Sequence, residues 1–82
     1  MAKKGLKLIR AKIDVVDNKI VALLRKRNRL ALQTLKYKKT VGDSKRVAFI
    51  LNKVKSRYAP ALTVFKAIIK ESKVQQKKAK VR

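Results

Sequence analysis

One arginine interrupts a regular apolar seam, and it is the first residue of this 82-residue chain that suggests chemistry. The seam advances in steps of four and three, which is typical of the inward face of one long helix. A guanidinium on such a face is costly unless an anion meets it. The chain has only four acidic residues, so we expect the anion to be a ligand. The seam comprises Ile9, Ile13, Val16, Ile20, Leu23, Arg27, Leu30, Thr34 and Tyr37.

Two further cations share this helix with Arg27. Lys38 follows by eleven residues, which returns it to within ~20° of the same face and ~16 Å further along. Arg10 precedes Arg27 by seventeen residues, and so lies ~25 Å away and ~100° around the helix. A straight helix therefore cannot bring Arg10 and Arg27 to one small ligand, whereas an antiparallel helix from a second subunit can.

The second half of the chain supplies polar groups that suit the same site. Ser72 and Gln76 are one helical turn apart, on the face that Ile69 is expected to bury. Asp43 and Arg46 stand three residues apart at the start of another expected helix. Together these positions predict a cationic pocket inside a helical bundle, suited to a small molecule with two carboxylates and an ether or hydroxyl group.

Composition limits the chemistry to hydrogen bonds and fixed charge. There is no cysteine and no histidine, so disulfides, thiolate metal sites and the commonest general base are excluded. We expect no cofactor and no metal. The formal net charge is +21, which favours anionic partners. No run approaches a membrane span and no signal peptide is evident, so a cytoplasmic protein is expected.

The helical pattern predicts an all-α chain of three helices in a single domain, 1–82. The first helix is expected over 5–39, ~50 Å long, which is too long for a compact chain whose radius of gyration should be ~12 Å. We therefore expect an obligate homodimer, in which a partner chain covers this helix. A break at 40–44 precedes a helix over 44–57, capped by Asp43 or Ser44. Pro60 is well placed to open the third helix, and the basic tail 77–82 is expected to fray.

These residues together resemble the all-helical class of chorismate mutases. The resemblance covers the chain from about Leu6 to Gln76 and rests on the runs LIRAKIDVVDNKIVALLRKRNRLAL, DSKR and IIKESKVQQ. It implies a domain-swapped dimer with two active sites, which rearranges chorismate to prephenate in aromatic amino-acid biosynthesis. No covalent or metal step is implied, so conformer binding and electrostatic stabilisation would be the whole mechanism.

The resemblance also implies a role for each candidate residue. Arg27 and the partner's Arg10 would bind the two carboxylates of chorismate. Lys38 and Gln76 would donate hydrogen bonds to the ether oxygen of the breaking bond.

The remaining three residues would complete the substrate site. Arg46 would add positive charge near a carboxylate, Ser72 would bind near the ring carboxylate, and Asp43 would help to hold the ring hydroxyl. The most important departure from the family pattern is Val47, which stands where a glutamate usually receives that hydroxyl, and the links on either side of the second helix also look shorter than usual.

Three alternatives remain open from the sequence. Val47 after Arg46 is similar to a pair found in isochorismate pyruvate lyases, so a lyase-like enzyme is the first alternative. Twenty-five lysines and arginines are compatible with nonspecific nucleic-acid binding, although aromatic stacking groups are scarce. The third alternative is a helical interaction module, which would have no cationic pocket and would tolerate Arg27→Ala.

Overall fold

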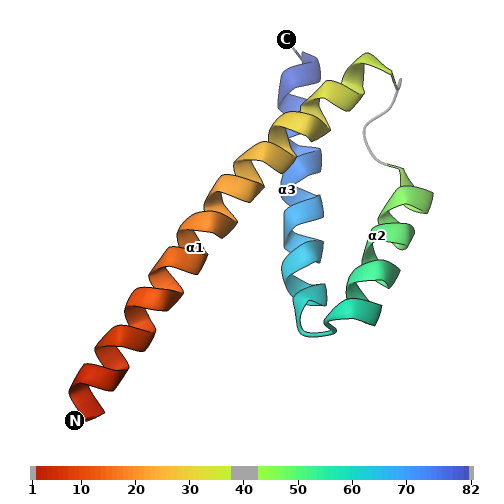
Figure 1. Cartoon of the computed structure of the whole chain (residues 1–82). Helices are drawn as coiled ribbons and strands as arrows, with labels where there is room; N and C mark the ends of the chain where they lie inside the picture. The colour runs from red at the N-terminus through yellow and green to blue at the C-terminus, as the bar shows by residue number, and fades with distance from the viewer. Residues whose placement is uncertain (1, 38–42, 82) are drawn as a thin grey trace.

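The chain folds into three α-helices joined by short connections (Figure 1). The computed structural model describes residues 2–37 and 43–81. The helices are α1 (Ala2–Gln33), α2 (Ser44–Arg57) and α3 (Ala61–Val81), with a short 3-10 helix, η1 (Thr34–Lys36), directly after α1. The described residues contain no strand, so the predicted all-α class is confirmed.

Helix α1 is the long first helix that the apolar seam predicts. Its 32 residues contain no proline, and a single glycine stands near its start. Figure 1 shows that its second half crosses α3, while its first half projects away from the other two helices. The seam residues of this outer half, such as Ile13 and Ile20, remain about half exposed. A single chain therefore leaves this apolar surface without cover.

The end of α1 differs from the expectation that the helix continues to residue 39. The α-helix ends at Gln33, and η1 follows over Thr34–Lys36. The Thr34 hydroxyl donates a hydrogen bond to the carbonyl of Ala31 at 2.6 Å, a local contact that competes with regular helix geometry. Tyr37, the expected last residue of the inward seam, is 88% exposed, so the seam does not extend that far.

Helix α2 begins and ends where the sequence predicts. Asp43 adopts an extended backbone, and its carboxylate accepts a hydrogen bond from the Arg46 backbone N–H at 3.1 Å. This N-cap satisfies one of the free N–H groups at the start of the helix. At the other end, Tyr58 leaves helical geometry after donating its N–H to the Val54 carbonyl. Asp43, one of the two residues expected to cap this helix, is therefore confirmed as its cap.

Helix α3 is the central element, because it contacts both α1 and α2. A turn through Ala59 and Pro60 precedes it, and the helix begins at Ala61, one residue later than expected. It continues to Val81, into the segment where fraying was expected. No proline or glycine interrupts that segment, and the lysines of its last turn favour the negative end of the helix dipole.

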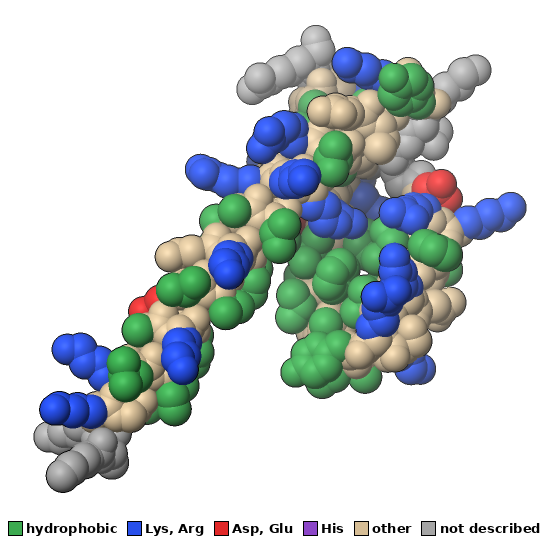
Figure 2. Space-filling model, viewed as in Figure 1, with side chains coloured by type: hydrophobic (Ala, Val, Ile, Leu, Met, Phe, Trp, Pro, Cys, Tyr) green, Lys and Arg blue, Asp and Glu red, His purple; other side chains and the backbone are tan. Residues whose placement is uncertain are grey.

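The described part of one chain has almost no buried core. Only Ile69 and Gln76, at 8% and 5% exposure, count as buried, and both belong to α3. The radius of gyration is 16.6 Å, and the molecule measures 58 × 30 × 15 Å. A compact chain of this length would have a radius near ~12 Å. Figure 2 shows hydrophobic side chains facing the open angle between the outer half of α1 and the other two helices.

No helix among the described residues is both long enough and apolar enough to cross a bilayer.

Candidate functional site

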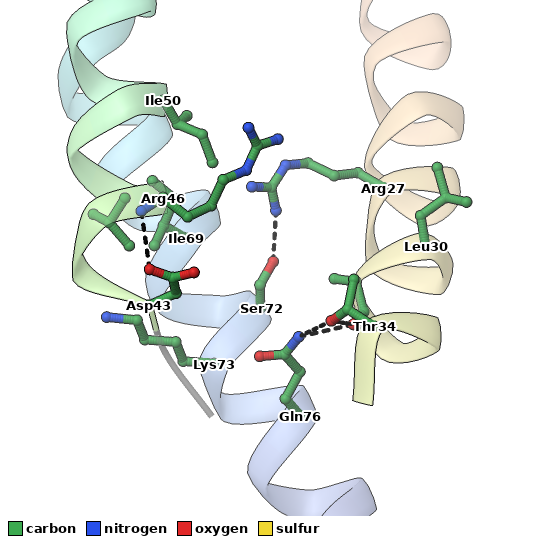
Figure 3. A pocket seen from close by; sticks show the side chains of 12 residues that line it. Arg27, Leu30, Thr34, Asp43, Arg46, Ile50, Ile69, Ser72, Lys73 and Gln76 are labelled. Atoms are coloured by element: carbon green, nitrogen blue, oxygen red, sulfur yellow. Dashed lines mark hydrogen bonds between the residues drawn. The ribbon is translucent and has the colours of Figure 1, made fainter. Parts of the chain in front are cut away.

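Arg27 joins α1 to α3 at the point where the two helices cross. Its Nη1 donates a hydrogen bond of 2.6 Å to the hydroxyl oxygen of Ser72 (Figure 3). The two residues are 45 positions apart in the sequence, and both are half-buried. The guanidinium that interrupts the apolar seam therefore lies at an inter-helix contact and keeps further N–H groups for a ligand.

Gln76 fixes the same pair of helices one turn further along α3. Its side-chain Nε2 donates to the Ala31 carbonyl at 2.8 Å and to the Thr34 hydroxyl oxygen at 3.3 Å. These two bonds satisfy a carbonyl near the end of α1, where helices leave such groups unpaired. Gln76 thus holds the turn that follows α1.

Helix α2 contributes an arginine and a carboxylate from its first turn. In Figure 3 the Arg46 guanidinium lies close to that of Arg27, and the Asp43 carboxylate lies below it near the start of α2. The Arg46 guanidinium also lies 5.4 Å from the centre of the Phe49 ring, a cation–π contact one turn along the helix. Because Asp43 caps the helix through a backbone N–H, its carboxylate has a fixed position.

A cavity of about 310 Å³ lies between these groups. Its size is at the lower end of the usual range for small-molecule sites. Apolar side chains from all three helices line it together with the polar groups, so a small ring with charged substituents is the kind of ligand it suits. The lining residues are Arg27, Leu30, Ala31, Thr34, Asp43, Arg46, Val47, Ile50, Ile69, Ser72, Lys73 and Gln76.

The electrostatics of the cavity favour an anion. The pKa of Arg27 is lowered from its ordinary value, chiefly because burial penalises the charged form and also because Arg46 repels it. A dianion between the two guanidiniums would counter both effects. The cavity therefore favours a negatively charged ligand, because Asp43 is the only acidic residue among the described residues that line it.

Five of the seven candidate site residues meet at this cavity. They are Arg27, Asp43, Arg46, Ser72 and Gln76. Lys38 lies outside the described residues. Arg10 is exposed on the outer half of α1 and is not among the residues that line the cavity, in agreement with the distance calculated from the helix geometry.

Two polar residues that line the cavity were not among the candidates. Lys73 follows Ile69 by four residues and precedes Gln76 by three, so the helical period could have assigned it to the same face. Thr34 was assigned to the seam, but its bonds to Ala31 and Gln76 were not anticipated. The hydrogen bond between Arg27 and Ser72 had no sequence signal beyond their separate helical positions.

The fold and the cavity define an all-helical protein with a cationic site for a small anion. The family model for chorismate mutase type II matches residues 9–77, and the chain belongs to this family. The match includes all seven candidate residues and shows that the chain is an enzyme of the isomerase class, with chorismate as its substrate. In the other two comparisons, no curated protein and no solved structure matches the chain.

Proposed function

We propose that chorismate binds in the cavity between Arg27, Arg46 and Ser72 and rearranges there to prephenate. The observation that carries this proposal is the convergence of two guanidiniums on one cavity in a chain of this family. Bound carboxylates would hold the substrate in its folded, reactive conformer. Hydrogen-bond donors facing the ether oxygen would stabilise the negative charge that develops there.

Gln76 is the donor for that oxygen within the described residues. Its Nε2 donates to the Ala31 carbonyl and the Thr34 hydroxyl oxygen, and the 3.3 Å bond to Thr34 is the longer of the two. An incoming ether oxygen would replace this longer bond at little cost, because one acceptor is exchanged for another. Lys38, just beyond the described residues, is the second donor that we propose.

We further propose that the enzyme is a homodimer in which each site receives Arg10 from the other copy. Support comes from the exposed apolar seam on the outer half of α1, and from the extended shape of the single chain. Two further hollows, of about 410 and 480 Å³, adjoin the cavity, and Arg27 lies at all three. A second α1 placed along this region would cover the seam and bring its own Arg10 close to Arg27.

Subunit mixing tests both proposals in one experiment. Arg10→Ala and Arg27→Ala should each abolish most chorismate turnover, with losses of roughly 10²–10³-fold in kcat/KM. Arg29→Ala, on an exposed part of the same helix, is the matched control and should retain full activity. When the two inactive variants are unfolded and refolded together in equal amounts, about a quarter of the wild-type activity should return, because half of the dimers then contain one intact site.

Each part of the proposal has its own contrary result. Absence of chorismate loss above background with the wild-type chain would contradict the assignment of the reaction to this cavity. Full loss in both single variants without recovery on mixing would contradict the supply of Arg10 from the other copy.

A further inference from the structure

Lys73 lines the cavity as a third cation, and it is not among the residues that the proposed function uses. It is half-buried on α3, on the face that carries Ile69 and Gln76. Figure 3 shows its side chain extending from α3 toward the start of α2, where Asp43 lies.

The other polar side chains that α3 places in the cavity are already engaged. Ser72 accepts from Arg27, and Gln76 donates to Ala31 and Thr34. Lys73 takes part in no hydrogen bond or ion pair among the described residues. Its three N–H donors therefore remain available to a ligand.

Asp43 provides the complementary acceptor. One carboxylate oxygen caps α2 through the Arg46 backbone N–H, and the second makes no hydrogen bond within the described residues. A hydroxyl group is the ligand function that needs one acceptor and one donor at the same time. An ammonium and a free carboxylate oxygen on the same wall of a cavity supply that pair.

We propose that Lys73 and Asp43 together bind the ring hydroxyl of the substrate. Lys73 donates a hydrogen bond to the hydroxyl oxygen, and the Asp43 carboxylate accepts a hydrogen bond from the hydroxyl O–H. The inference rests on the proposed function of the cavity and assigns its specificity for a hydroxylated ring. It also explains how the site orients the hydroxyl although Val47, the apolar residue after Arg46, offers no acceptor there.

The test compares chorismate with the analogue that lacks the ring hydroxyl, in three variants. Lys73→Met should lower kcat/KM for chorismate by about 10–100-fold, mostly through KM, since a hydrogen bond from a charged group is lost. Lys73→Arg should retain most of the activity. Lys70→Met, on the exposed side of the same helix, is the matched control and should behave as wild type.

The analogue gives the decisive result. Wild type should turn it over less well than chorismate, and Lys73→Met should lower its turnover no further, because the partner of the lysine is already absent. An equal loss with both substrates would show that Lys73 binds a carboxylate, and would overturn the inference. So would wild-type KM in Lys73→Met. Lys73→Gln serves as a second variant if Lys73→Met fails to fold, which circular dichroism would show.

Failure of this inference can be told apart from failure of the proposed function. If the wild-type chain shows no chorismate turnover, the assignment of the reaction to the cavity fails. If wild type is active and Arg27→Ala is not, while Lys73→Met is normal with chorismate, only the role of Lys73 is refuted.

Discussion

Arg27 shows how a residue can serve the fold and the ligand with the same group. One of its N–H groups donates to Ser72, which links α1 to α3, and its pKa is lowered. A lowered pKa means that the cavity stabilises the cation less well than water does. Binding of a dianion therefore relieves an existing cost in addition to forming new bonds.

Val47 is the residue whose replacement tests whether the ring hydroxyl still lacks an acceptor. It lines the cavity in the first turn of α2, directly after Arg46, where a carboxylate would also meet the positive end of the helix dipole. A hydroxyl has one hydrogen to donate, and we propose that Asp43 accepts it, so Val47→Glu should leave kcat/KM for chorismate close to the wild-type value. Steady-state turnover of chorismate is the measurement.

The control for this substitution is the neighbouring position. Ala48→Glu adds the same charge to an exposed residue outside the cavity lining and should leave turnover unchanged. A rise in activity in Val47→Glu that Ala48→Glu does not share would show that the hydroxyl lacks an acceptor, and would argue against the role proposed for Asp43.

At the scale of the elements, local sequence signals predicted most helix boundaries, and a contact distant in sequence accompanies the error at the end of α1. Both predicted ends of α2 were correct, because Asp43 caps its start and a turn through Ala59 and Pro60 follows its end. The end of α1 was wrong because Thr34 bonds back to Ala31 and accepts from Gln76, which is 42 residues away. No local pattern contains that contact.

The site was predictable to the extent that its residues share helical faces. Arg27, Ser72 and Gln76 were found from spacing, and the resemblance to the family added their roles. Lys73 was missed although its spacing from Ile69 and Gln76 places it on their face, because a lysine on a helix is ordinarily solvated and only the packing of α2 against α3 makes that face part of a cavity. The proposed position of Arg10 in the site depends on a second chain. Residue spacing within one chain can suggest such a partner but cannot determine where it binds.

The outer half of α1 gives a prediction at this scale. Ile13 lies on the seam that we propose a second copy covers, and it is half exposed in the single chain. Ile13→Lys should weaken dimerisation by about 10²–10⁴-fold, since each buried isoleucine contributes about 1.5–3 kcal/mol and the dimer contains two. Light scattering over a dilution series measures the change.

Val15 supplies the matched control, because it is similarly exposed but faces away from the seam. Val15→Lys should leave the molar mass unchanged. A wild-type chain that is monomeric at micromolar concentration, or an Ile13→Lys variant of wild-type mass, would argue against the seam as the interface.

For the whole molecule, the formal charge of +21 sets the conditions under which the substrate arrives. A field of this strength draws small anions toward the protein, and salt screens it over a Debye length of ~10 Å at ~0.1 M. The KM for chorismate should therefore rise several-fold between about 50 and 500 mM sodium chloride, with a smaller change in kcat. Sucrose at equal osmolality is the control, and a KM that does not depend on salt would show that the charge plays no part in capture.

The uncovered half of α1 has a consequence for how the activity responds to the amount of protein. A site that needs one segment from each of two copies exists only in the pair, so below the dissociation constant of the dimer its abundance follows the square of the chain concentration. Halving synthesis in that range would quarter the activity. The activity of such an enzyme would thus respond more steeply than in proportion to its expression level.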